Sequence, residues 1–173
     1  VPTLLDAIGE DPSKIDVGIS DQIGNSGFDG KSFFKALKGE TDKHRDFTYG
    51  VHTTRGVING SESYPIRSVR SDRYKYIQNL SHEELFYNVV TANDSGRPGY
   101  LLYESWLENA KNQEELSWVK HYKKRPFEEF YDLKSDPYEK NNLAQDPKYF
   151  DIKENLKNQL KLWMSQQGDL GVE

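Results

Sequence analysis

The sequence predicts an α+β fold, in which a C-terminal amphipathic helix packs on a small antiparallel sheet of about four strands after an N-terminal helical lead-in. Two stretches predict it. Residues 64–80 read as a hairpin, because β-branched and aromatic residues flank the polar turn Ser71-Asp72-Arg73. Residues 151–167 carry an apolar helical stripe that can cover a sheet. A hairpin alone is marginally stable in water, so further strands must lie beside it.

Two segments are the candidates for those strands. Residues 47–55 (FTYGVHTTR) and residues 127–133 (FEEFYDL) are rich in residues that favour strands, and we expect one on either side of the hairpin. Arg67, Arg70 and Arg73 recur every third residue, so on a strand they alternate between faces and cannot form one basic stripe. Each is predicted to pair with an acid of the neighbouring strand, from the set Glu128, Glu129 and Asp132.

The lead-in, residues 1–45, is expected to hold two short helices. Pro2 suits the first position of one helix, and Gly9 suits its end. A second helix is predicted over residues 31–38, with Gly39 after it.

The C-terminal half is predicted to be largely helical. Residues 100–122 follow a helical period, and Trp118 within them is expected in the core rather than on a carbohydrate-stacking surface. Asp146 as N-cap and Pro147 at the first position begin the last helix, and Gly168 ends it. The stripe of that helix consists of Ile152, Leu156, Leu160 and Trp163.

Length and composition exclude several classes of protein. At 173 residues the chain can bury one ordinary core. A net charge of −5 argues against a nucleic-acid-binding surface. The basic run at residues 121–125 (HYKKR) is interpreted as a solvated helix end in preference to an anion site. The absence of cysteine excludes disulfides, thiolate metal sites and cysteine nucleophiles, and no apolar run reaches the roughly 20 residues that span a bilayer.

Several stretches, in order, carry a resemblance to a known family. SYPIRSVRSDRYKYIQNL, then EEFYDLKSDPYEKNNLAQDP, then an amphipathic helix ending in a Trp resemble the C-terminal subdomain of sulfatases of the alkaline-phosphatase-like superfamily. They are most similar to the heparan N-sulfatase (N-sulfoglucosamine sulfohydrolase) branch. VPTLLDAIG and FDGKSFFKALKGE resemble the segment leading into that subdomain, so the resemblance covers nearly the whole chain.

The resemblance implies a division of the chain. Residues 1–45 would pack on a catalytic domain that this chain lacks, and residues 46–173 would form the subdomain. Val1 stands where an initiator Met would be, as expected of a piece cut from a longer protein. The expected partners are that N-terminal catalytic domain and a sulfated glycan, with no nucleic acid and no membrane span. A periplasmic, secreted or lysosomal location would suit such an enzyme.

The resemblance also implies an activity for the full-length protein, the hydrolysis of N-sulfate or O-sulfate groups on glucosamine-containing glycans of heparan type. Calcium and a formylglycine are expected in the missing domain. This chain has no CxPSR motif and no DDxG-type metal cluster. We therefore expect no cofactor, catalytic residue or metal site within it, and no activity from it alone.

His52, Thr54 and Arg55 are the candidate substrate contacts. They bring an imidazole, a hydroxyl and a guanidinium to the end of a predicted strand, a group that suits a sulfate or uronate oxyanion. The resemblance implies that this turn lies near the pocket mouth. The alternative interpretation is that they are ordinary polar residues of a strand edge.

Ser63 begins SYPIR, which matches the sulfatase C/S-x-P-x-R pattern for formylglycine. We predict no catalytic role for it, because a strand follows, and not the opening turn of a helix that holds an anion. Pro65 is expected to mark the start of that strand.

A second class of function remains open, a non-catalytic α+β carbohydrate-binding or interaction module. A large exposed apolar face on the first helix and on one side of the sheet would favour the sulfatase interpretation, because removing a domain exposes the apolar surface that it covered. A polar, self-contained surface would favour the module.

Overall fold

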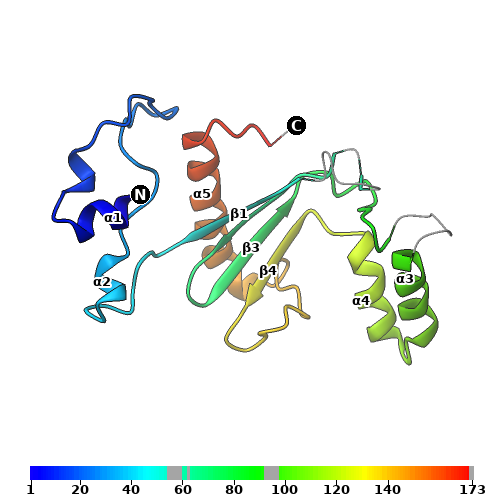
Figure 1. The fold of residues 1–173 in the computed structure, drawn as a ribbon. Coiled ribbons are helices and arrows are strands. Elements are labelled where there is room, and N and C mark those ends of the chain that lie inside the picture. The colour runs from blue at the N-terminus through cyan, green and yellow to red at the C-terminus, as the bar shows by residue number, and fades with distance from the viewer. Residues whose placement is uncertain (54–59, 62, 92–97, 172–173) are drawn as a thin grey trace.

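The computed structural model describes residues 1–53, 60–61, 63–91 and 98–171 and has the predicted α+β architecture (Figure 1). Its centre is a four-stranded antiparallel sheet in the order β1-β2-β3-β4. The strands are β1 (Thr48–His52), β2 (Ile66–Arg70), β3 (Tyr74–Asn79) and β4 (Glu128–Asp132). The hairpin and its two flanking strands are therefore confirmed.

The β2–β3 turn forms where its polar residues predicted it. The backbone N–H of Ser71 donates to the carbonyl of Tyr74 at 2.9 Å, and the N–H of Tyr74 donates to Ser71 Oγ at 3.0 Å. The turn sets a register that pairs Val69 with Tyr76, and β4 adds Phe130 opposite Tyr76. These three residues share one face of the sheet, and all three are fully buried.

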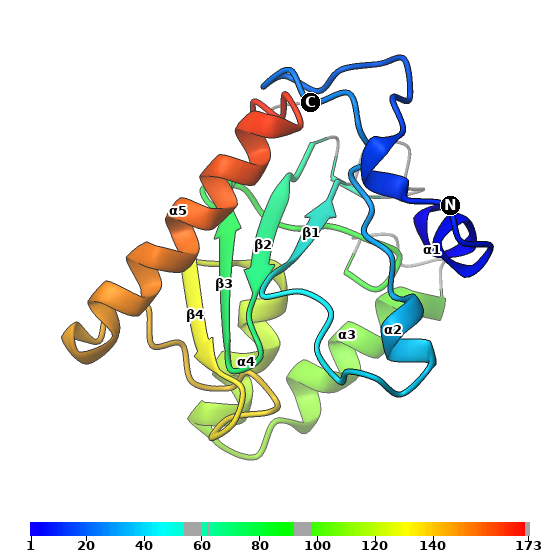
Figure 2. The ribbon, with the colours of Figure 1, turned by 90° about the vertical axis from the view of Figure 1, so that its left-hand side faces the viewer.

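The last helix, α5 (Phe150–Gln166), covers that face (Figure 2). A 3-10 turn, η2 (Pro147–Tyr149), precedes it, and Asp146 caps the turn by accepting from the N–H of Lys148 at 2.9 Å. The predicted stripe is confirmed: Leu156 and Leu160 are buried, and the Trp163 ring stacks on Tyr49 at 4.8 Å. Gly168 follows with φ of +66°, a conformation that favours glycine.

The helical pattern of residues 100–122 divides into α3 (Pro98–Asn109) and α4 (Gln113–Lys123). The break occurs because Asn112 Oδ1 accepts from the N–H of Glu115 at 2.9 Å and so caps a new helix. The prediction for Trp118 was wrong: its ring is half-buried and carries Lys140 Nζ 4.3 Å from its centroid.

The lead-in comprises α1 (Pro2–Ala7), the 3-10 turn η1 (Pro12–Lys14) and α2 (Phe34–Leu37). Gly9 and Gly39 end the helices with φ of +88° and +71°, as predicted. The second helix begins at Phe34 instead of Lys31, because Ser32 Oγ accepts from the N–H of Phe34 and donates to Asp6 of α1. No residue between 1 and 45 is buried, so this segment has no core of its own.

The arginines of the hairpin find different partners. Arg73 makes a bidentate ion pair with Asp132, as predicted. Arg67 instead pairs with Asp169, which corrects the expectation of a partner on the next strand. The reason is the register, which turns Arg67 toward the face covered by α5, where the segment after that helix supplies Asp169.

Candidate functional site

Of the three predicted contact residues, the structure places His52, while Thr54 and Arg55 lie outside the described residues. His52 is the last residue of β1 and pairs with Ile66 of β2. Its side chain therefore lies on the sheet face opposite α5, where its ring is 5.6 Å from that of Phe86. This face carries a second apolar cluster, formed by Tyr64, Ile66, Ile77, Phe86 and Tyr131.

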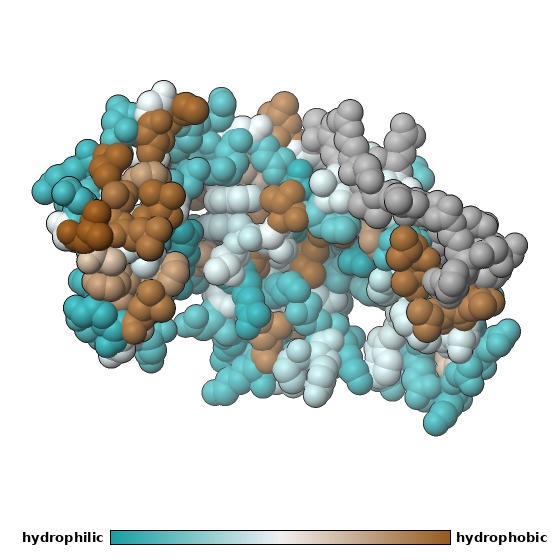
Figure 3. Space-filling view, viewed as in Figure 1, coloured by the Kyte–Doolittle hydropathy of each residue, from teal (hydrophilic) through white to brown (hydrophobic). Residues whose placement is uncertain are grey.

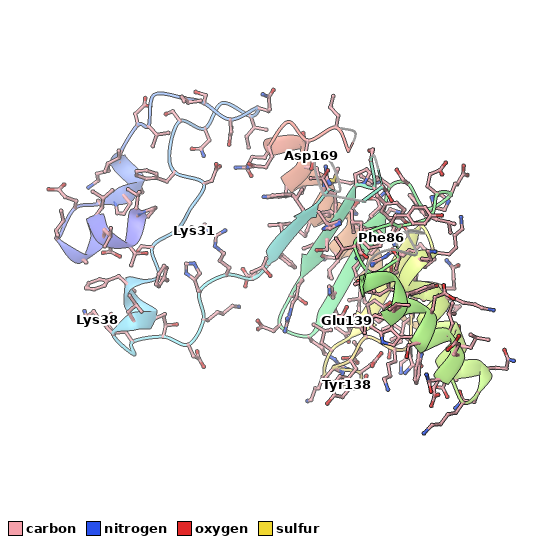
Figure 4. The ribbon with its side chains drawn as sticks, turned by 45° about the vertical axis from the view of Figure 1, so that its right-hand side comes forward. Lys31, Lys38, Phe86, Tyr138, Glu139 and Asp169 are labelled. Atoms are coloured by element: carbon pink, nitrogen blue, oxygen red, sulfur yellow. The ribbon has the colours of Figure 1, made fainter. Side chains whose placement is uncertain are left out.

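Phe86, labelled in Figure 4, is the residue whose ring the other side chains of this cluster contact. It lies in the connection after β3, and its N–H donates to the carbonyl of Lys123 at 2.8 Å, at the end of α4. Four side chains surround its ring; their distances to its centroid are 5.6 Å for His52, 5.3 Å for Tyr64, 6.1 Å for Tyr122 and 4.8 Å for the guanidinium carbon of Arg125. We call His52, Tyr64, Phe86, Tyr122 and Arg125 the Phe86 cluster. It joins a strand end, the approach to β2 and the end of α4.

Two donors in the Phe86 cluster are buried without a hydrogen-bond partner among the described residues, the hydroxyl of Tyr64 and Nε of Arg125. Burial raises the pKa of Tyr64, and the positive charge of Arg125 opposes that rise. Buried polar groups in native proteins are satisfied in the great majority of cases. Within the described residues, Tyr64 and Arg125 are therefore two exceptions to that rule.

An ion pair on the α5 side of the sheet fixes the backbone of His52. Arg67 Nη1 donates to the carbonyls of His52 at 3.3 Å and Ile66 at 3.1 Å, and Arg67 Nη2 donates to Asp169 Oδ1 at 3.0 Å. Asp169 also accepts from the N–H of Gly171 at 2.9 Å, and its side chain lies just after α5 (Figure 4). The hydrogen bond from Arg67 lowers the pKa of Asp169, so the carboxylate is charged at neutral pH.

A buried carboxylate holds the segment that carries Arg125. Glu129 Oε2 accepts from the hydroxyl of Tyr131 and lies 3.2 Å from His121 Nε2, while Oε1 accepts from Asn79 Nδ2 at 2.7 Å. The same Asn79 nitrogen donates to the carbonyl of Pro126, next to Arg125, at 2.7 Å. Burial alone would raise the pKa of Glu129, but these hydrogen bonds prevail and lower it to about 2. The Glu129 carboxylate is therefore charged at neutral pH, and both of its oxygens have hydrogen-bond partners.

One sequence feature pointed to part of this cluster, the basic run at residues 121–125. Arg125 ends the basic run of residues 121–125, for which a solvated helix end was the preferred interpretation. His121 instead pairs with Glu129, Lys124 Nζ donates to the carbonyl of Glu83, and Arg125 stacks on Phe86. No sequence pattern linked Tyr64 and Phe86 to Arg125, because these residues are far apart in the chain and come together only in the folded structure.

Ser63 is exposed in the segment that leads into β2, and the strand begins just after Pro65, as predicted. Within the described ranges, no three His, Cys, Asp or Glu side chains gather closely enough to hold a metal ion. Those ranges also contain no helix that is long and apolar enough to cross a membrane.

A groove lies between the lead-in on one side and β1 and α5 on the other. This groove has a volume of about 910 Å³, and its lining includes Lys31, Arg45, Tyr49 and Trp163. One wall belongs to the lead-in, which buries none of its own residues. The groove is therefore bordered by a segment that has no core of its own.

No protein-family model matches the chain. It is 39% identical over 142 residues, 82% of its length, to an ulvan-active sulfatase of Formosa agariphila, and 30% identical over 168 residues, 97% of its length, to a second one. The human N-sulphoglucosamine sulphohydrolase is 31% identical over 104 residues, 58% of the chain. The chain spans 25% of each of the first two proteins and 20% of the third.

Solved structures show the same fold. A 2-O GAG sulfatase matches 99% of the chain with a TM-score of 0.50 and 24% identity. A protein in complex with its substrate D-glucosamine-2-N,6-O-disulfate matches 98% with a TM-score of 0.51 and 18% identity. The chain spans 26% and 24% of these two structures.

Proposed function

This chain belongs to the sulfatase family, and we propose that it is the C-terminal part of an enzyme that hydrolyses sulfate groups on a glycan. The observation that carries the proposal is the similarity to sulfatases over up to 97% of the chain. The chain spans about a quarter of those relatives, so most of the enzyme lies outside it.

The lead-in supports a role in bracing a larger domain. In and just after α1, the side chains of Leu4 and Ile8 are 72% and 76% exposed. Further apolar side chains are exposed elsewhere in the lead-in, namely Val1, Ile19, Ile23 and Leu37. Figure 3 shows this hydrophobic surface gathered over the lead-in. Solvent-facing apolar surface of this kind is typical of an interface. We infer that residues 1–45 pack on the catalytic domain and that residues 46–173 form the attached subdomain. A self-contained module would have a more polar surface.

The catalytic chemistry belongs to that other domain. In sulfatases of this type, calcium and a formylglycine hydrate supply the nucleophile and the charge that stabilises the sulfuryl oxygens. The part of this chain, in the proposal, is to bind and orient the sugar. His52, Thr54 and Arg55 would contact an oxyanion of the substrate at the pocket rim, and the Arg67–Asp169 pair would hold the backbone at His52 in place.

Two substrate classes are in question. The resemblance and the human N-sulphoglucosamine sulphohydrolase favour sulfated glucosamine of heparan type. The ulvan-active relatives, which match more of the chain, favour a sulfated algal polysaccharide. Both classes present sulfate and carboxylate groups on sugar rings, so the same rim residues suit either.

The test is an assay of the protein that contains this chain, after peptide mass spectrometry has verified its formylglycine. Inorganic sulfate is measured after incubation with N-sulfoglucosamine, 6-O-sulfated glucosamine and ulvan oligosaccharides. We expect release from at least one of them, and none from residues 1–173 alone. Loaded enzyme that releases no sulfate from any of the three would refute the proposal.

A further inference from the structure

The connection between β4 and α5 exposes an aromatic side chain. Tyr138 is 81% exposed, whereas Phe150, the next most exposed aromatic side chain among the described ones, is 59% exposed. Exposure alone decides nothing, because single apolar side chains are common on protein surfaces. Two further features distinguish Tyr138, the backbone that carries it and the cation that lies beside it.

The turn that carries Tyr138 is held in one conformation. The next residue, Glu139, has a φ of +55° and is the only non-glycine residue with a positive φ among those that the structure describes. Lys75 of β3 fixes it, because its ammonium donates to both carboxylate oxygens of Glu139, at 2.9 and 2.7 Å. Asp136 Oδ2 closes the turn by accepting from the N–H of Asn141 at 2.8 Å. A strained residue persists where its surroundings hold it, and such residues gather at ligand sites.

Lys140 lies between two aromatic rings. Its Nζ is 4.3 Å from the centroid of Trp118, on α4, and 5.9 Å from that of Tyr138. The face of an aromatic ring attracts a cation, so the two rings keep the ammonium in place. The two carboxylates of the same turn are engaged elsewhere, and no carboxylate among the described residues forms an ion pair with Lys140. Because Lys140 is exposed, its charge is open to a ligand that comes from solvent.

We call Trp118, Tyr138 and Lys140 the Tyr138 platform. It lies apart from the surface that we assign to the catalytic domain: Figure 4 shows Tyr138 and Glu139 at one end of the sheet, well separated from Lys31 and Lys38 of the lead-in. A domain can therefore pack on the lead-in without covering the platform.

The platform also lies at the opposite end of the sheet from His52. The strand pairing places His52 beside Ile66 and Asn79, whereas the turn that carries Tyr138 follows Asp132, at the other end of β4. Since β4 has five residues, roughly 13 Å separates the two ends along the strand. A ligand that reaches both must be a chain of several sugars.

A ring and a cation side by side suit an acidic sugar. The negative face of an aromatic ring attracts the C–H groups of a sugar ring, and an ammonium attracts a sulfate or a carboxylate. We propose that the Tyr138 platform binds an acidic sugar unit of a long glycan, which stacks on Tyr138 and pairs with Lys140. The inference rests on the proposed function and deepens it, because a grip at this end of the sheet favours long chains over short ones.

The experiment measures oligosaccharide binding by calorimetry to the full-length protein that contains this chain, prepared without formylglycine so that the probes stay intact. Tyr138→Ala removes the ring, and Tyr138→Phe, which keeps it, is the matched control. Lys140→Gln removes the charge. Lys148→Gln is its control, because Lys148 is another exposed lysine of the same connection and its Nζ lies 5.4 Å from the Tyr149 ring. The melting temperature and the oligomeric state of each variant are measured as well.

The probes are a long oligosaccharide that carries sulfate and uronate, a disaccharide cut from it, and the desulfated and carboxyl-reduced forms of the long one, prepared from both ulvan and heparan sulfate. We expect Tyr138→Ala to weaken binding of the long probe roughly fivefold and Lys140→Gln roughly threefold. Affinity for the disaccharide and the melting temperature should not change, and both control variants should bind as wild type does. The modified long probe to which Lys140→Gln binds as tightly as wild type identifies the acidic group as sulfate or carboxylate.

Three results would overturn the proposal. The first is a wild-type protein that binds the long probe no more tightly than the disaccharide, or as tightly as Tyr138→Ala does. The second is an equal loss in Tyr138→Phe or Lys148→Gln, which would mean that no ring stacks on the sugar or that any lysine of this surface serves. The third is a change of oligomeric state in Tyr138→Ala, which would assign the platform to a contact between copies. Calorimetry needs no hydrolysis, so a failure of the sulfatase assignment leaves the binding result unchanged.

Discussion

Replacing Asp169 by Asn tests whether the tail after α5 holds the end of β1. The change keeps the shape of the side chain but removes the charge that faces Arg67. The Arg67 and Asp169 side chains are only 6% and 14% exposed, and two hydrogen bonds join them. Breaking a buried pair from one side generally costs about 3–5 kcal/mol, because the other charge is left buried.

We expect the lower end of that range for Asp169→Asn, about 3 kcal/mol. Arg67 retains its bonds to the carbonyls of His52 and Ile66, and the short tail after α5 can move aside and admit water. The assay is urea unfolding followed by tryptophan fluorescence, to which Trp163, stacked on Tyr49, contributes. Asp151→Asn, at an exposed acid of α5, is the control and should change stability by less than about 0.5 kcal/mol.

Acid provides an independent check of the same pair. The folded-state pKa of Asp169 lies below its unfolded value, so its stabilisation is present at neutral pH and is lost as the pH falls through the folded-state pKa. The stability difference between wild type and Asp169→Asn should therefore shrink below about pH 4. A difference under about 1 kcal/mol at pH 7, or one that does not change with pH, would refute the reasoning.

Three further predictions follow from other parts of the molecule. Leu160→Ala, at a fully buried position of α5, should lower the free energy of unfolding by about 3 kcal/mol, measured in urea; a loss below 1 kcal/mol would mean that α5 does not cover the core. Because the folded-state pKa of Glu129 is about 2, its stabilisation should disappear between about pH 5 and pH 2, and an acid titration of Glu129→Gln should lack that component. Arg55→Ala in the full-length enzyme should raise KM without lowering the melting temperature, whereas unchanged kinetic constants would remove Arg55 from the site.

Short-range signals made much of the fold predictable. The hairpin turn depends on Ser71 and its immediate neighbours, and the end of α5 depends on the conformational freedom of Gly168. The stripe that ends at Trp163 repeats within one helix, so it reveals the buried face without knowledge of the sheet. The break at Asn112 was equally local, as an N-cap in the middle of a helical pattern, but the periodicity on either side concealed it.

By itself, then, the sequence determined the strands, the glycines that end the helices, the buried face of the last helix and the likeness to sulfatases. The first three depend on residues a few positions apart, and the likeness depends on the order of several such stretches. Only the tertiary structure decided which groups meet. Arg67 finds Asp169 across 102 positions, and Tyr64 and Arg125 meet at Phe86 only after β2, the connection beyond β3 and α4 have packed together. No local pattern encodes such pairs, because the strand register and the docking of distant helices place them.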